Sequence, residues 1–172
     1  SGEDDWIGTL ILDAGVITDH GTESIAQLPR LTHLRLRQSP IGDAGLAEIA
    51  QCSSLLILNV PRCEATAKGV AQLAELPGLR NLRLGGPNLT ADTAAAIARI
   101  KSLRNLHLIG VPIGDEGLQQ IVSLPKLQSL YLDDSAVTSE GWDWLFEAHP
   151  GLHVHVNQKH LDRDPVTTDG KH

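Results

Sequence analysis

Hydrophobic residues recur along the chain with a period of 24 residues. Within each period, apolar residues stand at positions 1, 4 and 6, as Leu31, Leu34 and Leu36 do. The alternation at positions 4 and 6 is typical of a short strand with one buried face. Two consecutive periods even begin with nearly the same letters, LRNLRL and LRNLHL. The pattern therefore predicts six full repeats of one structural unit, which start at Ile7, Leu31, Leu55, Leu79, Leu103 and Leu127.

The second half of each repeat predicts a short helix. An apolar residue at position 11 is followed by a Thr, Gly or Asp pair, such as Gly42 and Asp43. A Thr or Asp side chain there is expected to accept hydrogen bonds from the free N–H groups that open a helix. Apolar residues at positions 16, 19 and 22, such as Leu46, Ile49 and Cys52, then form one helical stripe. Proline at position 23 ends the helix in three repeats, at Pro29, Pro77 and Pro125.

A strand, a turn and a short helix cannot bury their apolar faces alone, but stacked copies share a continuous core. The predicted fold is an α/β solenoid with parallel strands on the concave face and short helices on the convex face. Glycine recurs at position 15 and is expected to let each helix sit close to the sheet, at Gly21, Gly45, Gly69, Gly117 and Gly141.

We expect three parts along the chain. Residues 1–6 form an N-terminal cap segment, residues 7–156 form the repeat domain with a terminal strand, and residues 157–172 form a disordered tail. Four of the five aromatic residues, Tyr131 among them, fall in the last full repeat. Because an open solenoid must cover its core at both ends, we interpret Trp6 and the cluster Trp142–Phe146 as caps.

The consensus LxxLxLxxxxIxDxGLxxIxxLPx resembles the leucine-rich repeat family over roughly Ile7 to Val156. The forms IGDAGL and IGDEGL are most similar to bacterial repeats, including GALA-type effectors and planctomycete sets. The resemblance implies a horseshoe solenoid that binds proteins. Repeat position 9 departs from the family's asparagine ladder, which removes the usual side-chain hydrogen bonds between turns. Cys63 there is interpreted as a packing substitute, and Cys52 as a helix core residue.

The composition of the chain argues against several classes of function. The 172-residue chain carries a formal net charge of −7, which argues against a nucleic-acid binder or a protein of anionic membranes. No apolar run approaches the ~18 residues that span a bilayer, so we expect a soluble protein. No catalytic or phosphate-binding motif is present, and we expect neither an enzyme nor a cofactor.

The strand segments of repeats two to five contain no Asp or Glu but six of the nine Arg residues. Guanidinium groups in such a stripe suit carboxylates or phosphates of an extended partner. We therefore expect a monomeric module that binds a protein or peptide, of acidic character, on its concave face. Asp13, Asp133 and Asp134 are expected to bound the site. Its candidate residues are Arg35, Arg37, Arg62, Arg80, Arg83, Arg104, His33, His107, Asn59 and Tyr131.

Two alternatives remain open at this point. The segment HVHVNQKH near the C-terminus places His153 and His155 on one side of a strand, so a metal-binding or hydrolytic protein could use them with His160 and the nearby Asp residues. No closed four-ligand spacing accompanies them, and we expect no metal. The third hypothesis is a structural spacer within a larger protein.

Overall fold

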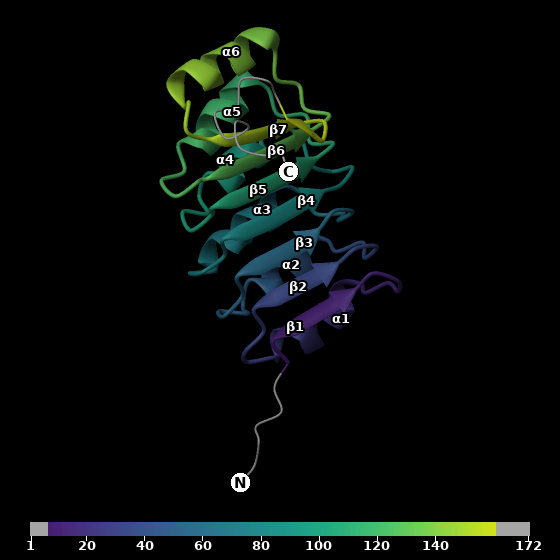
Figure 1. Cartoon of the computed structure of the whole chain (residues 1–172). Coiled ribbons are helices and arrows are strands. Elements are labelled where there is room, and N and C mark those ends of the chain that lie inside the picture. The colour runs from purple at the N-terminus through teal and green to yellow at the C-terminus, as the bar shows by residue number, and fades with distance from the viewer. Residues whose placement is uncertain (1–6, 161–172) are drawn as a thin grey trace, which may run out of the picture.

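The computed structural model describes residues 7–160. Eight strands form one sheet in the order in which they occur in the sequence, and the first seven are parallel (Figure 1). The strands are β1 (Thr9–Leu12), β2 (His33–Leu36), β3 (Ile57–Val60), β4 (Asn81–Gly85), β5 (Asn105–Ile109), β6 (Ser129–Asp133), β7 (His153–Val156) and β8 (Lys159–His160).

One short helix follows each of the first six strands and packs behind the sheet (Figure 1). The helices are α1 (Asp19–Ala26), α2 (Asp43–Ile49), α3 (Ala67–Gln72), continued by the 3-10 turn η1 (Leu73–Glu75), α4 (Thr93–Ile97), α5 (Asp115–Val122) and α6 (Ser139–Ala148). The predicted solenoid, with strands on one face and helices on the other, is confirmed. Of the described residues, no helix is long and apolar enough to cross a membrane.

The core lies between the sheet and the helices. Strand neighbours pair with a shift of one 24-residue repeat, as Leu34 with Leu58 and Leu82 with Leu106. Leucine side chains at repeat position 4 are thereby stacked into one buried column. Cys52 and Cys63 also lie in the core, where burial raises the pKa of both thiols.

Aspartate at position 13 makes several of the side-chain hydrogen bonds between repeats. Asp43 accepts hydrogen bonds from the N–H groups of Thr66 (2.7 Å) and Gly69 (3.0 Å) and from the Thr66 hydroxyl (2.8 Å), all in the next repeat. Asp115 contacts Thr138 of the following repeat in the same way, at 2.8 and 2.7 Å. We call this contact of a position-13 aspartate with the next helix start the inter-repeat clamp. The expectation that Thr or Asp side chains here accept hydrogen bonds from N–H groups at a helix start is confirmed, and the helix that Asp43 serves is that of the next repeat.

The clamp also lowers the pKa of its carboxylates. Partial burial works to raise the pKa of Asp43, but the hydrogen bonds from Thr66 and Gly69 outweigh it. The side chain and the N–H of Thr138 lower the pKa of Asp115. Both groups are therefore held in the charged form, which is the form that accepts hydrogen bonds best.

Glycine at position 15 makes room for an aspartate in three of the repeats. A Cβ atom on Gly69 would lie 2.5 Å from Oδ1 and 2.8 Å from Cα of Asp43. On Gly45 and Gly141 it would meet the carboxylates of Asp19 and Asp115. At these three positions the glycine makes room for the aspartate of the preceding repeat, whereas a Cβ atom on Gly21 or Gly117 would meet apolar side chains instead.

The C-terminal end of the solenoid is covered. Trp142, Trp144 and Phe146 of α6 are half-buried and pack against the core, as the cap interpretation requires. Residues 157–160 were expected in the disordered tail, but Asn157 and Gln158 turn the chain with positive φ and β8 pairs antiparallel with β7. Two successive residues with positive φ are typical of a tight hairpin. Trp6, the segment 1–6 and the rest of the tail lie outside the described residues.

Candidate functional site: the concave face

Side chains at repeat position 5 form a row across the concave face. They alternate with the buried leucines of positions 4 and 6, so they point away from the core. The strand register pairs each one with its neighbour 24 residues away. The row reads Ile11, Arg35, Asn59, Arg83, His107, Tyr131 and His155.

Arg35 is neutralised within this row. Asp13 lies at the end of β1, and its carboxylate faces the guanidinium at 2.7 Å from Nε and 2.9 Å from Nη2. Such a two-point contact occupies the edge of the guanidinium that would bind a partner's carboxylate. Asp13 was expected to lie at the boundary of the site, but it forms an ion pair with Arg35, one of the predicted site residues.

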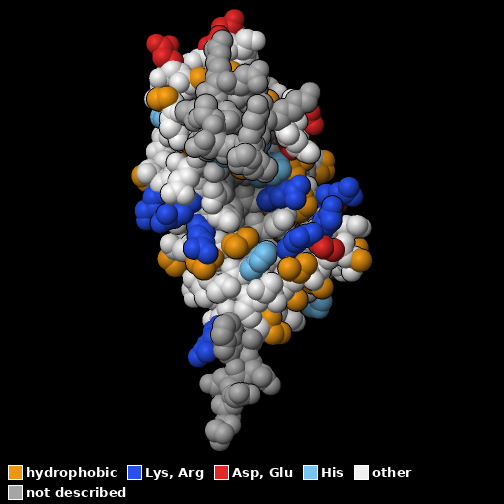
Figure 2. All heavy atoms as spheres, viewed as in Figure 1, with side chains coloured by type: hydrophobic (Ala, Val, Ile, Leu, Met, Phe, Trp, Pro, Cys, Tyr) orange, Lys and Arg blue, Asp and Glu red, His pale blue; other side chains and the backbone are white. Residues whose placement is uncertain are grey.

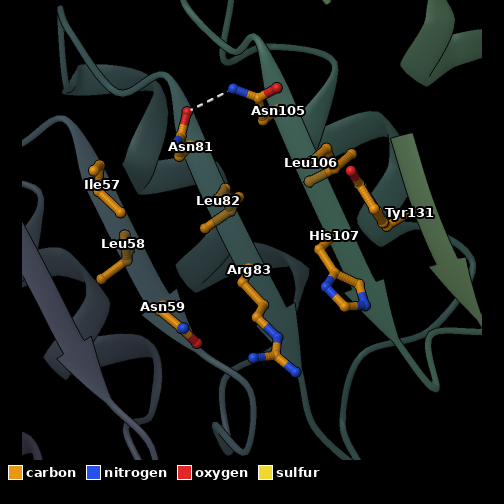
Figure 3. A pocket seen from close by; sticks show the side chains of 10 residues that line it. All are labelled: Ile57, Leu58, Asn59, Asn81, Leu82, Arg83, Asn105, Leu106, His107 and Tyr131. Atoms are coloured by element: carbon orange, nitrogen blue, oxygen red, sulfur yellow. Dashed lines mark hydrogen bonds between the residues drawn. The ribbon is translucent and has the colours of Figure 1, made fainter. Parts of the chain in front are cut away.

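Arg83 stands in a hollow at the centre of the face. The hollow has a volume of about 180 Å³ and is open to solvent (Figure 3). Nε of Arg83 and Oδ1 of Asn59 are buried, and neither has a hydrogen-bond partner among the described residues. Asn59, Arg83 and His107 come from three neighbouring strands and sit at one level of the sheet (Figure 3). The hollow therefore offers an unused donor and an unused acceptor side by side.

His107 and Tyr131 close one side of the hollow. Nε2 of His107 lies 2.9 Å from Oδ2 of Asp133. The other carboxylate oxygen of Asp133, Oδ1, accepts a hydrogen bond from the Gln158 N–H at 3.0 Å. Asp133 is only 8% exposed, so this contact holds the imidazole firmly. Tyr131 stacks on His155 with ring centroids 4.4 Å apart. Asp133 was expected at the boundary of the site, and it positions His107.

The other predicted arginines lie at the two rims of the face. Arg37 and Arg62 follow β2 and β3, whereas Arg80 and Arg104 precede β4 and β5, and all four are exposed. Because the strands are parallel, the first pair lies at their carboxyl ends and the second at their amino ends. Figure 2 shows Lys and Arg side chains on both sides of the face. His33 lies on β2, one repeat away from Ile57 at the edge of the hollow.

One pair of site residues is not among the candidates derived from the sequence. Nδ2 of Asn105 donates to Oδ1 of Asn81 at 2.8 Å, which bridges β4 and β5 beside the hollow (Figure 3). The signal was present in the repeated letters LRN of Leu79–Asn81 and Leu103–Asn105. From the sequence alone, these letters indicate only that two strands begin in the same way. An uncharged amide at repeat position 3 does not indicate which residue it pairs with.

Comparison with known proteins agrees with this architecture. The family profile described as Leucine Rich repeat matches residues 27–50, which is the length of one repeat. This match over one repeat is a likeness of the chain to the leucine-rich repeat family. The likeness to GALA-type repeats stays a prediction. A comparison with curated protein sequences gives no significant match.

Two solved structures are similar to this chain. Internalin C2 of Listeria monocytogenes str. 4b F2365 matches with a TM-score of 0.56 and 20% identity, over 87% of this chain and 80% of that one. The LRR ectodomain of the receptor kinase SOBIR1 from Arabidopsis thaliana gives a TM-score of 0.45 and 19% identity, over 83% and 67%. At such identities the likeness concerns the fold alone.

The histidines of β7 contact each other directly. Nε2 of His153 lies 2.8 Å from Nε2 of His155, within hydrogen-bond distance, which leaves no room for an ion between the two atoms. Across the described residues, no group of three or more His, Cys, Asp or Glu side chains could hold a metal. The side chain of His160 lies outside the described residues.

Proposed function

We propose that the chain is a non-catalytic, monomeric interaction module that binds an acidic segment of a protein partner on its concave face, with Arg83 as the central contact. One observation carries the proposal: Arg83 has a buried Nε without a partner among the described residues, whereas Arg35 in the same row is already paired with Asp13. A half-buried guanidinium without an acidic partner favours a carboxylate, to which it can donate two hydrogen bonds.

The size of the hollow supports a protein partner. Sites for small molecules and cofactors usually have volumes of about 300 to 1,000 Å³. The hollow has about 180 Å³, which fits one side chain of a larger partner. Such a partner would also lie along the rows of polar side chains on both sides of the hollow. Its specificity would then come from several shallow contacts around one anchored group.

The two unused atoms define the contact that we propose. A partner's Asp or Glu carboxylate accepts hydrogen bonds from Arg83, and a neighbouring N–H of the partner's backbone donates to Oδ1 of Asn59. Arg37 and Arg62 on one rim, with Arg80 and Arg104 on the other, attract the acidic segment at longer range. This long-range part of the attraction is screened by salt over about 8 to 10 Å at physiological ionic strength.

Selection from a peptide display library, followed by calorimetry on the selected peptides, tests the proposal. Arg83→Gln should weaken binding of acidic peptides at least about tenfold, because truncating one partner of a buried charge pair costs about 2 to 5 kcal/mol. Arg35→Gln is the matched control. It removes the same charge from the same row, but that charge is already neutralised, so affinity should fall by less than about threefold, consistent with an exposed-pair energy below about 1 kcal/mol.

Equal losses in the two variants would contradict the proposal, because the face would then act only through its overall charge. A library that yields no acidic binder for the parent chain would contradict it as well. Thermal unfolding should show that both variants keep the stability of the parent within about 0.5 kcal/mol, since both residues are on the surface.

A further inference from the structure

The hollow around Arg83 has an aliphatic wall that lies outside the core. Side chains at repeat position 3 form a second row on the concave face, and Ile57 is the one apolar member of this row among the described residues. The row reads Thr9, His33, Ile57, Asn81, Asn105, Ser129 and His153. Ile57 is half-buried and lines the hollow, but it does not pack against the core cluster. Its side chain is therefore available to a partner.

The floor of the hollow is apolar as well. It is formed by Leu58, Leu82 and Leu106, whose side chains are buried and whose strands pair with one another through their backbones. A partner's polar atoms must therefore find their hydrogen bonds at the walls, at Arg83 and Asn59.

The opposite wall of the hollow is already in use. Figure 3 shows Tyr131 at the far end from Ile57. The ring of Tyr131 contacts His107 on one neighbouring strand and His155 on the other, with ring centroids 5.5 and 4.4 Å apart. The apolar surface that remains for a partner is therefore centred on Ile57.

We infer that the acidic segment bound on the concave face is extended and carries an aliphatic residue two positions from its acidic residue. The carboxylate binds Arg83, and the aliphatic side chain packs against Ile57. This inference rests on the proposed function and specifies the partner of that same site.

The spacing of two residues follows from the sheet. Ile57 pairs with Asn81, and Arg83 lies two residues further along β4. Neighbouring strands are about 4.8 Å apart and two residues of a strand span about 6.6 Å, so Ile57 and Arg83 are about 8 Å apart. In an extended peptide, side chains two residues apart lie on one face, about 6.6 Å from each other. Adjacent side chains point to opposite faces and cannot contact both residues.

The unused acceptor of Asn59 favours an extended segment over a helix. Asn59 lies on the same strand as Ile57 and pairs with Arg83, and its buried Oδ1 has no hydrogen-bond partner among the described residues. Inside a helix, the backbone N–H groups are bonded to carbonyls of that helix. An extended segment instead offers an N–H group between its two anchored side chains, which can donate to Asn59.

A set of synthetic peptides tests the inference. Each holds one glutamate and one leucine in a glycine and serine background, with the leucine one, two or three residues from the glutamate and in either order. NMR titration of the full chain measures affinity, including weak affinity. The better order of the two-residue spacing should bind at least about fourfold more tightly than the other spacings, the factor for roughly one CH₂ group removed from water.

Ile57→Asn places on β3 the residue type that β4 and β5 carry at this position. It should abolish the advantage of the two-residue spacing. Binding of a peptide with glutamate alone should stay within about twofold, as for sites that do not interact. Ile109→Asn is the matched control, because it changes a half-buried isoleucine of the same sheet that does not line the hollow. The control should keep the advantage.

The results separate this inference from the proposed function. Equal binding at all spacings, or an unchanged advantage in Ile57→Asn, would overturn the inference, and a loss of glutamate binding in Arg83→Gln would still support the proposed function. Tightest binding at the three-residue spacing would indicate a helical partner and would also overturn it. If no peptide binds, or if Arg83→Gln binds as the parent does, the proposed function fails and the inference fails with it.

Discussion

The junctions on either side of the fourth repeat differ from those near the two ends of the solenoid. Where the second repeat meets the third, Asp43 reaches the start of α3, and where the fifth meets the sixth, Asp115 reaches the start of α6. The third and fourth repeats carry Ala67 and Ala91 at the same position. The middle of the chain therefore lacks the clamp, and its helix α4 has only five residues.

The clamp needs an aspartate and a receiving glycine on opposite sides of a repeat boundary, and Gly117 shows that the glycine also occurs without the aspartate. The fourth repeat follows Ala67 and has Thr93 at position 15, so both members of the pair are missing together. Thr93 is fully buried, and its hydroxyl has no hydrogen-bond partner among the described residues. Side-chain bonds elsewhere replace the clamp at this boundary, such as that from Asn88 to the Glu64 carbonyl at 2.9 Å.

The largest effect is expected from Gly69→Val, in a clamped junction. The added side chain would strike Asp43 at both its carboxylate and its backbone, so unfolding free energy should fall by about 3 kcal/mol, as in overpacked cores. Thr93→Val is the matched variant at the unclamped boundary. It keeps the shape and removes an unpaired buried hydroxyl, so stability should stay level or rise. Urea titration measures the unfolding free energy of both variants. Similar losses of stability in the two would contradict the difference between clamped and unclamped boundaries.

Asp43→Ala should cost less, about 2 kcal/mol, because it leaves the N–H groups of Thr66 and Gly69 without an acceptor. Asp92→Ala is its control, since that carboxylate caps no helix N–H and bonds to no other repeat. We expect the control to stay within about 0.5 kcal/mol of the parent. Denaturant midpoints measure both, and an equally large loss in the control would show that the acidic charge matters and the clamp does not.

Acid should weaken the clamped junctions selectively. The folded-state pKa values of Asp43 and Asp115 lie below the ordinary value of 3.8, so the unfolded chain binds protons first as pH falls. Their contribution is therefore present above about pH 4 and is lost as pH falls through the lower folded values. A double variant with Asp43→Asn and Asp115→Asn cannot titrate there. Its unfolding free energy should fall less steeply below about pH 4, and a slope equal to the parent's would refute this.

The smallest effect is a gain, from building a clamp where none exists. Ala91 lines a hollow of about 500 Å³ beside Gly114 and Gly117, which are the residues at the receiving positions. Ala91→Asp should stabilise the fold by about 1 kcal/mol, the usual size of a helix-start hydrogen bond. Ala67→Asp should give no gain, because Thr93 fills the space that a glycine would leave. Thermal unfolding compares the two variants, and a gain in both would mean that the glycine is unnecessary.

Much of the concave site could be predicted from the sequence, but its chemistry could not. The 24-residue period assigns each residue to a column, so Arg35 and Arg83 were correctly placed in one row. Among the described residues, Arg35 is paired with an acidic side chain and Arg83 is not. This difference depends on Asp13, which lies at the end of β1 and contacts Arg35. At repeat position 9, Ser39 accepts a hydrogen bond from the Ile17 N–H of the preceding repeat at 3.0 Å, although no side-chain bond between turns was expected there. The inter-repeat clamp was not predicted either.

The sequence by itself determined the repeats, the alternation of strands and helices, and the side of the sheet on which each residue lies. Those properties follow from local periodicity, because a strand or a helix buries whichever face is apolar. The tertiary structure alone decided which side chains meet across a boundary, such as His107 with Asp133 and Asp43 with Gly69. The partners in each pair are 26 residues apart in the sequence and lie 2.9 and 3.0 Å apart in the fold. Whether they meet depends on how neighbouring repeats are placed and on side-chain rotamers, and the hydrophobic pattern carries no information about either.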